Sequence, residues 1–150
     1  MMEMVIEPER LLELAEEMAT RAQEQNAGHA AVAVLAAHAA LEAIVNRLGG
    51  ETVGSFNYRA RFLPKWHDLC ERTIGRQLES APDLERLHAL RGAVVGYRGD
   101  PQRLDRRSTS PPPEAPGAIG AEEARWAVES ARRVIAEFHR AAGRDAPGWV

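Results

Sequence analysis

The stretch Leu84–Tyr97 reads L-E-R-L-H-A-L-R-G-A-V-V-G-Y and decides how this chain is interpreted. Its apolar residues recur at the spacing of one face of an α-helix. The same stretch carries Arg91, whose charge must reach either water or an acidic partner. Gly92 and Gly96 lie about one turn apart on one face, where another backbone can approach closely. The stretch therefore predicts a helix that packs against other helices.

The composition favours helices over sheets, because Ala and Leu dominate while Ile, Thr, Tyr and Phe are scarce. The length of 150 residues is typical of one domain. The single cysteine, Cys70, excludes an intramolecular disulfide and is typical of a reducing cytosol. The N-terminus lacks the pattern of a secretory signal, and the apolar run Ala30–Val45 is too short to span a bilayer. We therefore expect one cytoplasmic, all-α domain without a membrane partner.

Apolar periodicity and capping residues predict about five helices, arranged as an antiparallel bundle. The second helix is apolar nearly all round, so we expect it at the centre, ended by Gly49 and Gly50. A flexible Pro-rich linker is expected at about 102–120, and the tail 145–150 is expected to be loose unless Trp149 docks. The expected helices are Pro8–Gln25, His29–Leu48, a third with Pro64 in its first turn that ends near Arg72, Pro82–Tyr97 and Ala121–Ala142.

One polar line interrupts the apolar second helix. His38, Glu42 and Asn46 are spaced four residues apart and so share a face. A charge left alone inside a bundle costs several kcal/mol, about 3–5 when its partner is removed. We therefore predict that Glu42 pairs with Arg91 across two helices, with His38 or Asn46 completing the hydrogen bonds.

Charge is distributed unevenly along the chain. Residues 1–58 contain nine acids and three bases, whereas residues 59–107 contain eleven bases and seven acids. A local basic region can bind phosphate even on an acidic protein. The plainer interpretation is a solvated surface that neutralises the acidic first helix. The sequence leaves open whether the segment 59–107 contacts RNA.

Three segments together resemble the HEPN superfamily. They are A-H-A-A-L-E-A-I-V-N-R-L at 37–48, F-L-P-K-W-H-D-L at 62–69 and L-H-A-L-R-G-A-V-V-G-Y-R at 87–98, in the family's order. The resemblance covers roughly residues 9–142, and only the Glu of the second helix and the Arg motif are specific. It implies a helical bundle, often dimeric. Many members are metal-independent RNases, and some are toxins paired with nucleotidyltransferase antitoxins.

The family's RNase motif is incomplete in this chain. The motif is an Arg followed by a polar residue, with a His separated from that Arg by four to six residues. Arg91 matches the Arg, but Gly92 takes the polar position, and Gly96, Tyr97 and Arg98 occupy the three positions for the His. None of these three is the imidazole that handles protons in the family. The resemblance therefore implies a degenerate site, a pseudo-RNase.

Two histidines, two glutamates, Tyr97 and Cys70 are the other residues that could carry chemistry. His88 precedes Arg91 by one helical turn and is a candidate substitute base, as is Tyr97; a capped or surface histidine is the commoner role. His38 with Glu42, and Glu85 with His88, have ligand spacing, but no third ligand or second Glu-x-x-His is evident. No metal or cofactor is predicted. Cys70 has no evident catalytic partner, as expected of a buried thiol.

The sequence is compatible with three functions. The first is a catalytically degenerate HEPN-like homodimer that binds RNA, a nucleotide or a protein partner. The second is an active RNase using Arg91 with His88 or Tyr97. The third is a helical partner subunit of a nucleotidyltransferase. For the homodimer, the expected interface includes Gly92, Gly96 and Arg98; alternatively, the glycines admit a helix of the same bundle or fray the helix end.

Overall fold

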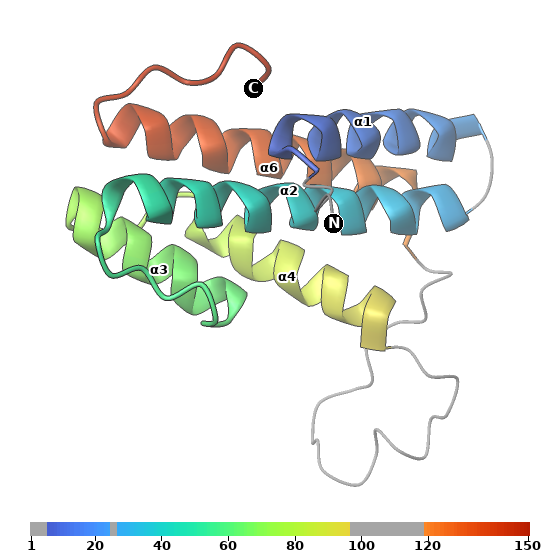
Figure 1. Cartoon of the computed structure of the whole chain (residues 1–150). Coiled ribbons are helices and arrows are strands. Elements are labelled where there is room, and N and C mark those ends of the chain that lie inside the picture. Colours follow the sequence, from blue (N-terminus) through green and yellow to red (C-terminus); the bar gives the residue numbers. More distant parts are fainter. Residues whose placement is uncertain (1–5, 25–26, 97–118) are drawn as a thin grey trace, which may run out of the picture.

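The computed structural model describes residues 6–24, 27–96 and 119–150, and these form five helices packed together without strands. The predicted all-α class and the number of helices are confirmed. Figure 1 shows α1 and α4 running opposite to α2 and α6. The helices are α1 (Pro8–Glu24), α2 (Ala27–Thr52), α3 (Phe62–Ile74), α4 (Ala81–Gly96) and α6 (Ala121–Ala141).

The second helix lies at the centre of the bundle, as its sequence predicts. α2 contacts each of the other four helices, with α1 and α6 packed together on one side and α3 and α4 on another. Its small side chains allow this close approach, because Ala33, Ala37 and Ala40 are fully buried. Burying one larger core side chain stabilises the fold by about 1.5–3 kcal/mol. The bundle is therefore held mainly by the covering of α2.

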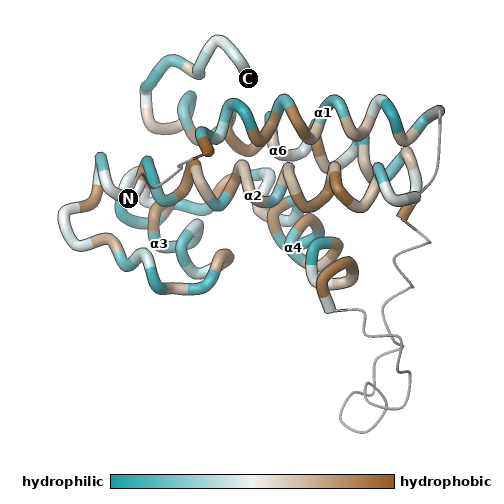
Figure 2. Tube along the Cα trace, turned by 45° about the vertical axis from the view of Figure 1, so that its right-hand side comes forward, coloured by the Kyte–Doolittle hydropathy of each residue, from teal (hydrophilic) through white to brown (hydrophobic). Residues whose placement is uncertain are grey.

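The outer helices are amphipathic. Figure 2 shows α1 alternating between hydrophilic and hydrophobic segments, as expected for a helix with one face in water. Its buried face includes Leu12, Ala15 and Ala19. The facing side of α6 buries Val128 and Phe138, and the Phe138 ring meets the indole of Trp66 edge-on at 6.2 Å between centroids. α6 is thereby joined to α3 as well as to α1.

The expected end of the second helix is wrong. Gly49 and Gly50 lie inside α2, which continues to Thr52. The reason is tertiary: the loop after α2 returns over the helix, so a Cβ on Gly49 would lie 2.5 Å from the Phe56 ring, and one on Gly50 would lie 2.5 Å from the Tyr58 hydroxyl. These glycines make room for two aromatic rings rather than stopping the helix.

Other helix boundaries follow the sequence closely. Gly75 and Gly143 have positive φ angles of 72° and 68°, the conformation that ends a helix and that glycine adopts without steric cost. At the start of α4, Ser80 donates its N–H to the carboxylate of Glu137 at 3.0 Å, which connects α4 to α6. The tail takes the docked alternative, because Trp149 is partly buried against the core. Of the predicted linker 102–120, only residues 119–120 lie inside the described ranges.

Within the described residues, Gly28–Thr52 is the one helix long and apolar enough to cross a membrane by length and composition. The helix is longer than the run Ala30–Val45, so the length argument against a membrane span does not hold. Of the apolar window in this helix, 56% is buried inside the bundle, and a mostly buried apolar helix is typical of the core of a globular protein.

Two glycine substitutions on different helices test the packing of the loop after α2. We expect Gly49→Ala to destabilise the fold by about 1–3 kcal/mol, because the new Cβ must displace the buried Phe56 ring. Gly92→Ala is the matched control: nothing lies within 4 Å of its Cβ. That change is expected to stabilise α4 by about 0.5–1 kcal/mol. Urea unfolding of both variants measures the two signs, and equal behaviour would contradict the packing of Phe56 on α2.

Candidate functional site

The polar line of α2 faces α3 and α4, and each of its three residues has a polar partner there. His38 is hydrogen-bonded to His88 of α4. Glu42 and Asn46 both accept hydrogen bonds from the ammonium group of Lys65 on α3. The line is therefore a seam that joins α2, α3 and α4. The sequence predicted where the seam lies on α2, but it did not predict which side chains it bonds to.

Lys65 is the residue that fixes this seam. Its side chain is only 2% exposed, whereas that of Glu42 is 37% exposed. The Lys65 Nζ atom donates to Glu42 Oε1 and, at 2.9 Å, to Asn46 Oδ1. A buried ammonium needs such acceptors, because removing one partner of a buried pair costs about 3–5 kcal/mol. The burial of Lys65 therefore commits the Glu42 carboxylate to α3.

The predicted ion pair between Glu42 and Arg91 is wrong. Among the described residues, Glu42 pairs with Lys65, and Arg91 is exposed on α4 without an ion-pair partner. Because Arg91 is exposed, water can solvate its guanidinium group, and no carboxylate partner is needed. The buried ammonium group of Lys65 has no such access to water.

Two histidines and a phenylalanine form a compact ring cluster beside this pair. His38 Nε2 and His88 Nδ1 are 3.1 Å apart, so one ring nitrogen donates to the other. Phe62 lies 4.1 Å from His38 and 5.3 Å from His88 between ring centroids. Burial, followed by the positive charge of Arg91, lowers the pKa of His38 from the usual 6.5 to about 4. His38 is therefore neutral near pH 7 and anchors His88 without adding charge.

A cleft of about 830 Å³ opens beside the ring cluster. α2 contributes His38 and Glu42 to its wall, and α4 contributes His88 and Arg91. The remaining lining residues are Leu35, Ala39, Arg59, Ala60, Arg61, Phe62 and Val95. Three arginines from two separate segments thus meet one carboxylate that Lys65 already neutralises. The arrangement is suited to an anion.

Of the three residues predicted at a dimer interface, the structure describes Gly92 and Gly96. Gly92 and Gly96 are exposed, and a Cβ on either would meet nothing within 4 Å. The alternative that they admit a helix of the same bundle is therefore wrong. Arg98 and the candidate base Tyr97 lie outside the described residues.

Neither a reactive thiol nor a metal centre is found among the described residues. The Cys70 side chain is buried, and burial raises the pKa of its thiol to about 11, so the nucleophilic thiolate is disfavoured. Within residues 6–24, 27–96 and 119–150, no three His, Cys, Asp or Glu side chains come together in a way that could hold a metal ion.

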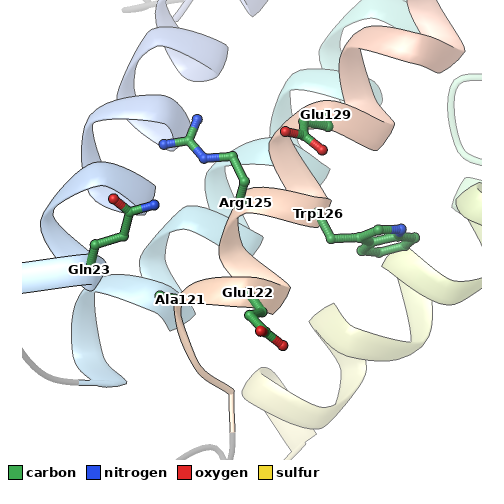
Figure 3. A pocket seen from close by; sticks show the side chains of 6 residues that line it. All are labelled: Gln23, Ala121, Glu122, Arg125, Trp126 and Glu129. Carbon is green, nitrogen blue, oxygen red and sulfur yellow. The ribbon is translucent and has the colours of Figure 1, made fainter.

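A second depression, of about 310 Å³, lies between α1 and α6. Figure 3 shows Arg125 extending toward α1, while Trp126 points away from it toward α4. The Trp126 ring is already covered by the guanidinium of Arg86, 4.2 Å from its centroid. Because the side chains of this depression diverge, the first cleft is the candidate site. The other residues that line the depression between α1 and α6 are Gln23, Ala121, Glu122 and Glu129.

Sequence reasoning missed Lys65, Arg59 and Arg61 as residues of the site. A signal for Lys65 was present: it lies between Phe62 and Leu69 at the apolar spacing of α3, where a charge needs a buried partner. Arg59 and Arg61 lie in a loop without periodicity, and only the folded chain brings them to Arg91.

Comparisons of this chain with known protein families, with curated proteins and with solved structures each found no match.

The low pKa of His38 makes the stability of the fold dependent on pH. Because the folded pKa of about 4 lies below the usual 6.5, the unfolded chain binds this proton first as the pH falls. Stability from His38 is complete above about pH 6.5 and is lost progressively down to about pH 4, by up to about 3 kcal/mol.

His38→Gln is the variant that isolates this effect, since the amide can still bond to His88 but does not titrate. We expect urea unfolding at pH 7 and pH 4.5 to show a smaller loss of stability in His38→Gln than in the unaltered protein. The difference removes the contribution of carboxylates, which titrate in both proteins. The same pH dependence in both would mean that His38 is not held neutral by the fold.

Proposed function

We propose that this chain is a HEPN-like binding module that takes a phosphate-bearing ligand, RNA or a nucleotide, into the cleft between α2, α4 and the start of α3. The observation that carries the proposal is the cluster of Arg59, Arg61 and Arg91 around one cleft. Arginine is the side chain best suited to phosphate, because its planar guanidinium binds two oxygens at once.

The charge state of these arginines supports the proposal. In the described part of the chain, none of the three has an ion-pair partner, and Glu42, which shares their cleft, is held by Lys65. Most of the other arginines in the described ranges are paired with a carboxylate. Those pairs involve Arg10, Arg21, Arg47, Arg72, Arg132, Arg133 and Arg144. The cleft thus gathers three unpaired arginines, whereas most of the other described arginines are neutralised by a carboxylate.

The start of α3 adds to the attraction of an anion. Arg61, the residue before the helix, makes no side-chain hydrogen bond to the first turn, and Arg61 and Phe62 both line the cleft. The free N–H groups and the dipole of a helix N-terminus favour a negative ligand. This contribution acts together with the guanidinium groups.

A charge-matched pair of variants tests the proposal. We expect Arg91→Ala to weaken binding of a short labelled oligoribonucleotide by about tenfold, because a charge-assisted hydrogen bond contributes about 1.5–3 kcal/mol. Arg76→Ala is the control, since Arg76 is exposed, lies outside the cleft and carries the same charge. Fluorescence anisotropy at two salt concentrations measures both. Equal weakening by the two variants, or no binding at low salt, would contradict a built site.

A second candidate function is metal-independent RNA cleavage with Arg91 and His88. The observation that favours it is the hydrogen bond between His38 and His88, since a general base is oriented by another group and His38 can orient His88. In that role, His88 would take the proton of an attacking hydroxyl while Arg91 stabilised the charge on phosphate. The incomplete motif favours binding over cleavage.

Incubating RNA with the protein in a metal chelator separates the two functions. As a non-catalytic module, the protein should leave the RNA intact at any concentration that saturates binding. Cleavage that disappears in His88→Gln and in Arg91→Ala, but persists in Arg76→Ala, would replace the binding proposal with the RNase. Gel analysis of the RNA is the measurement.

The proposed partner of the module is a second copy of the chain. The open space over Gly92 and Gly96, with Val95 55% exposed between them, is what close approach of two α4 helices requires. A native mass measurement of the oligomer decides this point. The role as a partner subunit of a nucleotidyltransferase stays a prediction, and reading the neighbouring genes tests it.

A further inference from the structure

We propose that Glu42, held by Lys65, is the residue that selects the ligand of the cleft: a phosphate ester that carries a free hydroxyl group next to its phosphate. The inference rests on the proposed function, because it concerns the same cleft. It adds the chemical class of the ligand and assigns its recognition to a carboxylate instead of an arginine.

The two oxygens of the Glu42 carboxylate have different surroundings. Oε1 accepts the hydrogen bond from Lys65. Oε2 makes no hydrogen bond to another described residue, while the side chain is 37% exposed and lines the cleft. One oxygen is therefore anchored, and the other is an acceptor available to a ligand.

Lys65 anchors the Glu42 carboxylate from a fixed position. Lys65 is 2% exposed and is bonded at the same time to Asn46 at 2.9 Å, so the ammonium has a fixed position on α3. A carboxylate bonded to a fixed ammonium loses little further freedom when a ligand arrives. The same bond keeps Glu42 from neutralising Arg91. Lys65 thus acts as a positioning residue for the acceptor and leaves the arginines free.

The ligand group that fits the free oxygen of Glu42 is a neutral hydrogen-bond donor. A second phosphate offers only acceptor oxygens near neutral pH and cannot donate a hydrogen bond to Oε2, which disfavours polyphosphates. An ammonium group on the ligand would be repelled by Arg59, Arg61 and Arg91, which line the same cleft. A neutral hydroxyl is not repelled by these arginines and can donate a charge-assisted hydrogen bond to Oε2. A ribose carrying one phosphate has this combination of groups.

The ligand pair 3′-adenosine monophosphate and its 2′-deoxy form tests the inference, because they differ only in the hydroxyl beside the phosphate. We expect the ribonucleotide to bind at least about tenfold more tightly, the usual effect of a hydrogen bond to a charged group. A five-nucleotide RNA and the matching DNA distinguish a nucleic acid from a free nucleotide. The same preference in the oligonucleotides supports the selection, and its absence from both pairs overturns it.

Glu42→Gln assigns the preference to a residue. The Gln oxygen can keep the bond to Lys65, which leaves the NH₂ group facing the cleft as a donor instead of an acceptor. We expect the preference for the hydroxyl to fall to about twofold or less, with inorganic phosphate competing at least as well as before. Glu51→Gln, on the same helix but paired with Arg144 outside the cleft, should keep the full preference.

The outcomes separate this inference from the proposed function. Equal binding of the two mononucleotides and of the two oligonucleotides by the unaltered protein overturns the selection and leaves the phosphate cleft intact. No binding of any of these ligands, or of inorganic phosphate as competitor, overturns both. If Glu42→Gln does not fold by circular dichroism, the ligand comparison on the unaltered protein still decides the selection.

Discussion

The bond between Lys65 and Glu42 is the interaction on which the site depends. An ammonium group that is 2% exposed cannot stay charged inside a bundle without an acceptor. Placing it against Glu42 and Asn46 fixes α3 on α2, and this fixes the loop that carries Arg59 and Arg61 to the rim of the cleft. The charge arrangement of the cleft is thus a consequence of how one lysine is buried.

The central position of α2 explains why the cleft lies where it does. α2 is covered by α1 and α6 on one side, and it buries a series of apolar residues that includes Ala33, Ala37 and Ala40. The side toward α3 and α4 carries His38, Glu42 and Asn46 instead, and apolar side chains cannot cover these groups without leaving them unpaired. Polar partners and an opening to water satisfy them, so the polar line of α2 becomes the wall of the cleft.

How much of this follows from the sequence depends on whether the cause is local or tertiary. The helices, and their ends at Gly75 and Gly143, follow from periodicity and backbone conformation, which are local. The end of α2 does not, because Gly49 is required by a Phe56 ring that returns from the following loop. Spacing alone shows the polar line, but whether Lys65 or Arg91 meets Glu42 depends on which cation is buried.

The histidine pair limits the kind of charge that the cleft can carry. His38 is neutral near pH 7, because burial and the neighbouring cations Arg91 and Lys65 disfavour a second positive charge. The hydrogen bond to His88 then joins two rings of the cleft wall, of which His38 stays neutral near pH 7. Attraction of an anion therefore comes chiefly from guanidinium groups, whose charge does not change over the physiological range. Binding based on such permanent charges depends more on salt than on pH. Because buried His38 adds no charge near pH 7, salt is the solution variable that controls the binding of an anion in this cleft.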